Sequence, residues 1–269
     1  MDSFTIELVS NASSELFPDN TLSSFTNFFP EQVNLEGQWE VAVSEISYPS
    51  MYQNITEGKF KFSDNDLCKT YRDYYYLEPG LYHSLTDIVE AMNKMIQEKN
   101  NHNETCISLK VCRETQKVEI SLINTWSVLV FASSDLGHIF GFDISNEFEG
   151  VMMGGNKTIK PPYAYDIVRI HSLMIYTDIV EYNIVGDTKA PLLRCFPFIS
   201  KVKSGDVITT GQYMNYQTFS NLQFRRLLKN SFHSVHIDLR DTTGEKIPFM
   251  SVGITRLVLM FRKVSDIHL

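Results

Sequence analysis

The sequence predicts a mainly β protein in which a single jelly-roll β-sandwich is interrupted by a small α+β insertion domain. Three observations lead to this fold class. Apolar and polar residues alternate in short runs near both ends of the chain, as they do in half-buried strands. One clear stretch, at 85–96, has apolar residues at helical spacing. The strands of the two ends together number about eight, which is the count that a two-sheet jelly roll needs.

Residues 1–50 are expected to supply the N-terminal strands of the sandwich. Apolar and polar residues alternate over 4–8 and again over 39–46, and residues 22–29 are a third candidate strand. Turn-forming residues separate these runs, notably Pro30 and Gly37. Three strands cannot close a sandwich, so their partners are expected elsewhere in the chain.

Residues 51–164 are expected to form the α+β insertion domain. Its long helix, at 85–96, is expected to bury one face. Ser84 is the predicted N-cap of this helix, and Asp87 is the predicted capping-box partner. A second, short helix is predicted at 134–140, with a Ser-Asp cap and a stop at Gly141. Strands are predicted at 59–62, 73–77, 107–111, 118–122 and 128–131, and residues 150–162 are predicted to be the exit linker. The apolar positions of the long helix are Leu85, Ile88, Val89, Met92, Met95 and Ile96.

Residues 165–269 return to the β pattern and are expected to complete the jelly roll. Candidate strands lie at 173–180, 192–198, 206–211, 232–238 and 255–262. Gly186 is predicted to form a tight turn before residues 191–193, and Gly244 is predicted to close a hairpin between two core strands. An insertion at an exposed loop leaves such a sandwich core intact.

Composition excludes several classes of protein. With 43% hydrophobic and 21% charged residues the chain has enough apolar surface to fold around a core. Its net charge of −8 and its one short basic stretch, at Arg225, Arg226 and Lys229, argue against nucleic acid as a direct partner. The N-terminal residues have neither a basic leader nor a long apolar run, so neither a signal peptide nor a membrane span is expected. The protein is therefore expected to be made and used in the cytosol or nucleus.

No catalytic, cofactor-binding or metal-binding residue is predicted, and no cofactor is expected. Of seven histidines only His233 and His236 are close in sequence, and positions three apart on a regular strand point to opposite faces. A cupin-like enzyme of the same fold class would need a converging histidine cluster, which is not apparent. Cys68, Cys106, Cys112 and Cys195 show no CxxC spacing, and the motifs of serine hydrolases, zinc proteases and P-loop NTPases are missing.

Two local patterns allow both a structural and a functional interpretation. Asp64 and Asp66 could act as an acid and base pair, but a solvated turn is the favoured explanation, because closeness in sequence does not establish the geometry of such a pair. The run Tyr74-Tyr75-Tyr76 could line a sugar or peptide groove, or its alternating side chains could fill both faces of a sheet. The structural interpretation is preferred for both.

Several segments of the sequence resemble the minor capsid, or penton, proteins of Polinton (Maverick) elements and their virus-like relatives. The resemblance covers residues 3–48, LEPGLYHSLTDIVEAMNKMI at 77–96 and LGHIFGF at 136–142. It continues in LMIYTDIVEYNIVGDTKAPLLRCFPF at 173–198 and FHSVHIDLRDTTGEKIPFMSVGITRLVLMFRK at 232–263. These segments contain no catalytic motif, so the resemblance assigns no site residues to this chain.

The resemblance implies a single-jelly-roll capsid protein that forms homopentamers at the five-fold vertices of an icosahedral virus-like particle. The expected partners are copies of the chain and a double-jelly-roll major capsid protein, and the expected location is the virion vertex, assembled inside the host cell. The inserted unit is then expected to project from the capsid surface. The alternative is a jelly-roll module that binds a carbohydrate or a host receptor, and a jelly-roll enzyme is the third hypothesis.

Overall fold

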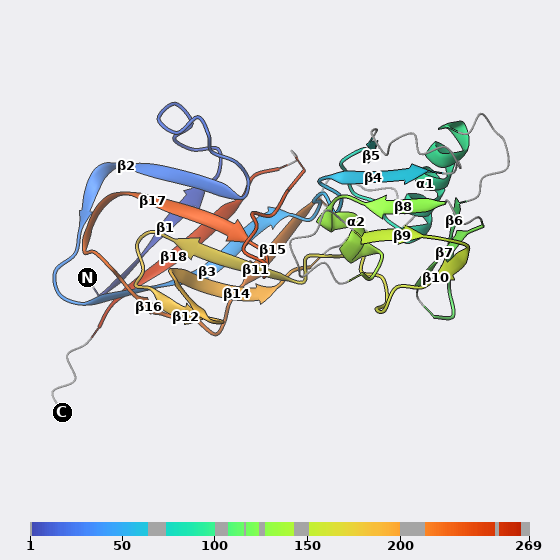
Figure 1. The fold of residues 1–269 in the computed structure, drawn as a ribbon. Helices are drawn as coiled ribbons and strands as arrows, with labels where there is room; N and C mark the ends of the chain where they lie inside the picture. Colours follow the sequence, from blue (N-terminus) through green and yellow to red (C-terminus); the bar gives the residue numbers. More distant parts are fainter. Residues whose placement is uncertain are drawn as a thin grey trace. The chain divides into compact units, whose positions relative to one another are not determined.

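The computed structural model describes residues 2–63, 74–99, 107–115, 117–123, 127–142, 151–199, 213–250 and 253–264. The protein is mainly β, with strands in several sheets and two helices in these segments (Figure 1). The chain divides into two compact units. Unit 1 comprises Met1–Tyr52 and Ile170–Leu269, and unit 2 comprises Gln53–Arg169.

Unit 1 contains two antiparallel sheets and a separate hairpin. The strands of the first sheet are ordered β1 (Ser3–Val9), β18 (Arg256–Lys263), β3 (Trp39–Pro49) and β15 (Met214–Thr218), and the short β16 (Arg225–Arg226) also pairs with β3. The strands of the second sheet are ordered β14 (Leu192–Pro197), β11 (Ser172–Thr177), β17 (Ser231–Arg240) and β2 (Ser24–Asn34). The hairpin joins β12 (Asn183–Val185) to β13 (Thr188–Ala190).

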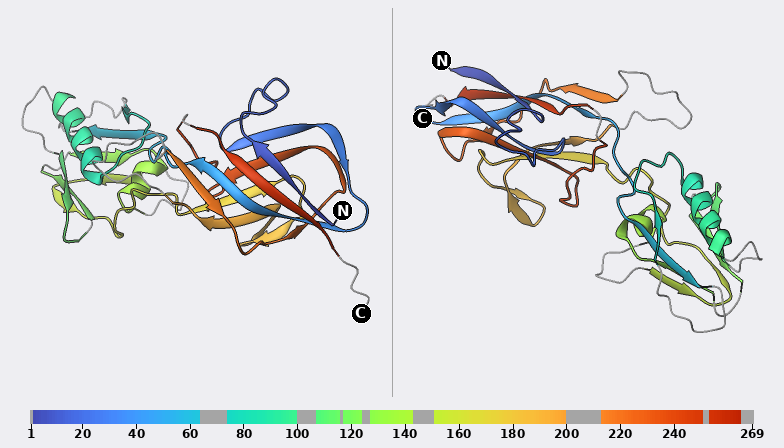
Figure 2. Two further views of the ribbon diagram at one scale, coloured as in Figure 1. Left: turned by 180° about the vertical axis from the view of Figure 1, so that it is seen from behind. Right: turned by 90° about the horizontal axis from the view of Figure 1, so that it is seen from above.

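The two sheets of unit 1 lie face to face and share one apolar core. Alternation along β17 buries Val235, Ile237 and Leu239, because successive strand residues point to opposite faces. From the other sheet, β18 buries Leu257, Leu259 and Phe261 in the same cluster. Phe232 and Phe261 bring the layers into contact, with ring centroids 6.2 Å apart. Figure 2, in its right-hand view, shows the two layers edge-on.

One prediction for unit 1 needs correction, a second is confirmed with an addition, and a third falls outside the described residues. Gly244 has a positive φ of 89°, but its turn does not join two core strands of one sheet, because β17 and β18 belong to different sheets. Instead the turn brings Lys246 back beside Arg240 in an isolated bridge. Gly186, with φ of 62°, does form a tight turn, but it closes the β12–β13 hairpin, which was not predicted. The candidate strand at 206–211 lies outside the described residues.

Within its described residues, unit 2 combines two small sheets with two helices. One sheet is ordered β10 (Lys157–Ile159), β7 (Lys117–Leu122) and β6 (Ile107–Cys112). The other is ordered β5 (Tyr75–Leu77), β4 (Gly58–Ser63), β8 (Val128–Phe131) and β9 (Val151–Gly154). The exit-linker prediction for residues 150–162 is wrong, since β9 and β10 pair there with β8 and β7.

The long helix, α1 (Leu85–Lys99), confirms the sequence prediction in its position and in its buried face. Leu85, Ile88, Val89, Met92 and Ile96 are buried in the core of unit 2, and Met95 is partly buried beside them. The capping box is formed in both directions: the Asp87 N–H donates to Ser84 Oγ, and the Ser84 N–H donates to Asp87 Oδ2, each at 3.1 Å. These two bonds satisfy backbone donors that the first helical turn leaves free.

The short helix, α2 (Ser134–Ile139), is also present, but its predicted Ser-Asp cap is not. The N-cap residue, Ser133, makes no side-chain capping hydrogen bond, and its hydroxyl instead accepts the Lys59 N–H at 3.3 Å. Gly141 ends the helix with a φ of +82°. A Cβ at this position would lie 2.5 Å from the Tyr163 carbonyl oxygen, so glycine is required both for conformation and for space.

Candidate functional site

The sequence predicted no catalytic, cofactor-binding or metal-binding residue. In the described segments, no group of three or more His, Cys, Asp or Glu side chains could hold a metal ion. Cys112 and Cys195 are free thiols, whereas Cys68 and Cys106 lie outside the described residues, as do Asp64 and Asp66. Within the same segments, no helix is long and apolar enough to cross a membrane.

The two neighbouring histidines lie on one side of β17, contrary to the prediction that they point to opposite faces. The register of β17 against β2 shifts between Phe232 and Ser234, where a bulge changes the phase of the strand. Phe232 and Val235 are consequently both buried, while His233 and His236 are both on the outer side. His233 stacks on Phe28, with ring centroids 5.8 Å apart, and His236 joins a different set of contacts.

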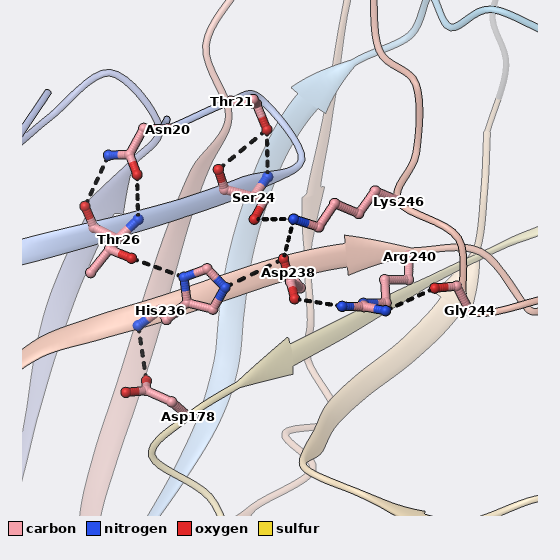
Figure 3. A network of polar contacts seen from close by, with 10 residues as sticks. All are labelled: Asn20, Thr21, Ser24, Thr26, Asp178, His236, Asp238, Arg240, Gly244 and Lys246. Atoms are coloured by element: carbon pink, nitrogen blue, oxygen red, sulfur yellow. Dashed lines mark hydrogen bonds and ion pairs between the residues drawn. The ribbon is translucent and has the colours of Figure 1, made fainter. Parts of the chain in front are cut away.

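A polar network on this outer side is centred on Asp238, and Figure 3 shows its members. Arg240 Nη2 donates to Asp238 Oδ2 at 2.9 Å, and Lys246 Nζ lies 3.6 Å from Asp238 Oδ1. His236 Nε2 lies 3.4 Å from the same oxygen. Lys246 also donates to Ser24 Oγ at 2.8 Å, which ties the loop after β17 to the start of β2.

The ends of the network extend to other segments of unit 1. His236 Nδ1 is 2.9 Å from Thr26 Oγ1, and the His236 N–H donates to Asp178 Oδ1 at 2.9 Å. The side chain of Asn20 exchanges two hydrogen bonds with the backbone of Thr26, at 2.8 and 3.0 Å. The network therefore joins the loop before β2, strands β2 and β17, and the segment after β11 (Figure 3).

The charge balance of the network determines the ionisation of its carboxylate. Burial disfavours the charged form of Asp238, but hydrogen bonds from Arg240 and Ser24 and the charges of His236 and Lys246 outweigh it, so the pKa of Asp238 is lowered. The carboxylate is thus held ionised between its cationic neighbours. This arrangement links strands and loops of unit 1 to one another.

A hollow of about 750 Å³ adjoins the network at the end of unit 1 where β2 begins. Lys246, Ser24 and Thr21 belong to both the hollow and the network, and Ile247 and Phe249 add apolar surface. The hydroxyl of Thr21 donates to the Ser24 carbonyl and accepts the Ser24 N–H, so it is used within the wall. The lining offers both polar and apolar contacts.

Exposed apolar side chains form the second notable feature of unit 1. Tyr182 and Ile184, at the start of the β12–β13 hairpin, are 61% and 79% exposed. Leu228 is 55% exposed, and its N–H donates to the Ile179 carbonyl, which places it beside the segment leading to the hairpin. Among the described strands the hairpin pairs only with itself, and it extends away from the sheet layers (Figure 2, right). Sequence reasoning missed this surface because residues 183–190 were assigned only a turn, although 182–185 carry an apolar pattern.

Unit 2 presents a surface of different chemistry, which we call the tyrosine–lysine face and define as Lys59, Lys61, Tyr74 and Tyr76. Tyr75 is partly buried against the core of unit 2, whereas Tyr74 and Tyr76 are exposed. The prediction that successive tyrosine side chains of this run alternate between the two faces of a sheet is therefore confirmed.

Comparison with known proteins found similar solved structures but no matching family. The sequence matches no protein-family model and no curated protein. Similar solved structures include the mavirus penton protein, which is 12% identical with a TM-score of 0.45 over 97% of this chain and 100% of that one. They also include a chain of the Sputnik virophage, which is 9% identical with a TM-score of 0.45 over 98% of both chains. These two structural neighbours are virophage- and Maverick-related proteins, the group that the quoted sequence segments resemble.

Proposed function

We propose that unit 1 is a single jelly roll, that unit 2 is an insertion between its third and fourth strands, and that the chain is a penton-like structural protein of a capsid. The strand order supports the jelly roll. Its eight strands in chain order are β1, β2, β3, β11, β14, β15, β17 and β18. The sheet orders β1-β18-β3-β15 and β14-β11-β17-β2 are those of two interlocked Greek keys.

In this role five copies form a closed ring at a five-fold vertex, next to a double-jelly-roll major capsid protein. A ring of identical subunits needs a head-to-tail interface, in which two different surfaces of each copy meet. Obligate interfaces of this type bury more than about 2,000 Å² in total and are more apolar than the average surface. The sequence phrases that resemble penton proteins are the observation that carries this assignment.

The β12–β13 hairpin is our candidate for one side of the ring interface. Isolated exposed apolar residues are ordinary, but Tyr182, Ile184 and Leu228 are gathered at one end of unit 1. Burying Ile184 against a second copy removes from water the most exposed large apolar side chain among the described residues. The same unit offers a hollow with apolar surface near Ile247 and Phe249.

Light scattering and negative-stain imaging of the purified full chain test the proposal. We expect five-fold rings and a mass of about 155 kDa for five chains of 31.0 kDa. Ile184→Lys should shift the protein toward smaller species, whereas Ile123→Lys, at an exposed position in unit 2, should leave the mass unchanged. A strictly monomeric protein at high concentration under several salt conditions would refute the capsid-vertex role.

A further inference from the structure

The tyrosine–lysine face is the outer side of a sheet whose inner side is packed. In β4, Phe60 is buried, and the flanking Lys59 and Lys61 point away from the core. The ring of Tyr75 packs inside against Phe60 and Phe62, with centroid distances of 5.8 and 4.7 Å. Tyr76, 55% exposed and opposite Lys59 in the β4–β5 register, therefore lies on the same outer side as the lysines.

The two lysines and the two tyrosines are in contact. The ammonium groups of Lys59 and Lys61 are 4.2 and 3.9 Å from the centroid of the Tyr74 ring, within the range of cation–π attraction. The Tyr74 and Tyr76 rings are 6.4 Å apart and inclined by 48°. The face thus presents two cations beside an open pair of aromatic rings.

The charges of this face are available to an external anion. Lys59 pairs with Glu57 at 3.8 Å, but the Glu57 side chain is 59% exposed, and such surface pairs contribute little. Among the residues that the structure describes, no carboxylate lies within ion-pair distance of Lys61. A local pair of cations on a chain of net charge −8 favours a negatively charged partner at this position.

We propose that the tyrosine–lysine face binds a carboxylated sugar. Each feature of the face fits one part of such a ligand: a tyrosine ring packs against the apolar C–H side of the sugar, and lysine forms a charge-assisted hydrogen bond with the carboxylate. The binding role is additional to the capsid role and does not depend on ring formation.

The same geometry disfavours single-stranded nucleic acid. A base held between two rings needs them parallel, and rings inclined by 48° do not form that slot. Two lysines also supply too few phosphate contacts for strong counterion release. A single carboxylate, in contrast, needs only one or two cations.

Saturation-transfer NMR on the full-length protein tests the proposal with N-acetylneuraminic acid and its methyl ester as probes. The ester keeps the ring and loses the charge, so its dissociation constant should be at least about tenfold higher. Lys61→Met, which keeps an apolar stem, and Tyr76→Ala should each weaken binding of the acid by a similar factor. Lys94→Met, at an exposed lysine on α1 of the same unit, is the matched control and should bind like the unchanged protein.

Several outcomes would overturn the inference. One is that the acid and the ester bind with equal dissociation constants. Another is that Lys61→Met and Tyr76→Ala bind the acid as tightly as the unchanged protein does. A third is that neither probe shows saturation transfer at about 10 mM. Displacement of the sugar by a short oligothymidine that binds more tightly would assign the face to nucleic acid instead. If the sugar-binding proposal fails, the measurements of the five-copy assembly are unaffected, because neither the sugar nor these variants involve the β12–β13 hairpin of unit 1.

Discussion

Asp135 is a buried carboxylate whose removal should destabilise unit 2 strongly. Its Oδ2 accepts the Thr56 N–H at 2.7 Å, the Thr56 hydroxyl at 2.5 Å and the Glu57 N–H at 3.0 Å. Its Oδ1 pairs with Arg169 Nη1 at 2.6 Å, and the side chain is 5% exposed. Arg169 also donates to the Asn54 carbonyl at 3.3 Å. One carboxylate on α2 thus joins the first and last segments of unit 2.

The expected magnitude follows from these contacts. Removing one partner of a buried ion pair costs about 3–5 kcal/mol, because the other charge and its donors are left unpaired. Arg169 retains 23% exposure, so water relieves part of this loss, and we expect about 3 kcal/mol for Asp135→Ala. Asp135→Asn keeps one acceptor oxygen and should cost about 1–2 kcal/mol.

Hydrogen exchange followed by mass spectrometry measures this effect unit by unit. Asp135→Ala should accelerate exchange in peptides of β4, α2 and β8, and a double-mutant cycle with Arg169→Met should give a coupling free energy above about 1 kcal/mol. The control is Glu98→Gln, which removes only an exposed helix pair and should change stability by less than about 0.5 kcal/mol. Should Asp135→Ala behave like this control, the carboxylate would not be the structural centre that its contacts indicate.

Three further variants test other parts of the structure. Gly141→Ala combines a positive φ with a Cβ placed against the Tyr163 carbonyl, so it should lower the free energy of unfolding by more than about 1 kcal/mol, measured by urea titration. Phe261→Ala removes a fully buried ring that stacks on Phe4 at 4.8 Å, and should cost about 3–5 kcal/mol in the same titration; a loss below 1 kcal/mol would contradict the packing. Because the pKa of Asp238 is lowered by folding, its contribution to stability is present above the ordinary value of 3.8 and lost as pH falls through the folded pKa. Thermal unfolding at pH 5 and pH 3 should therefore show a smaller acid-induced fall in Tm for Asp238→Asn than for the unchanged protein, and identical falls would refute the assignment.

Local features of the fold could be read from the sequence with good accuracy. Helix α1 and its Ser84–Asp87 capping box depend on residues within one helical turn, so spacing alone locates them. Strands follow from short-range alternation in the same way, as for β6 and β7, where the predicted ranges 107–111 and 118–122 each fall one residue short of the observed strand. The burial of the α1 face follows from the 3.6-residue period.

Several of the features that the sequence did not reveal depend on distant partners. The bulge in β17 exists only in its register with β2, and it alone decides that His233 and His236 share a side. Strands β9 and β10 contain or flank glycines, and their pairing with β8 and β7 overrides the local turn signal. The Asp238 network likewise draws on residues as far apart as Ser24 and Lys246, and neither position carries a local motif.

The proposed insertion has a physical consequence that separates it from an ordinary two-unit protein. Strands β3 and β11 belong to different sheets of unit 1, so the chain between them must cross from one sheet to the other whatever its length. A long connection at this point breaks no hydrogen bond of either sheet, and loop length itself adds little entropic cost. The buried clusters of the two units accordingly share no residue. If unit 2 is such an insertion, the losses from Asp135→Ala and Phe261→Ala should add within about 0.5 kcal/mol in the double variant. A larger coupling would show that the units share a core, and the interrupted jelly roll would have to be abandoned.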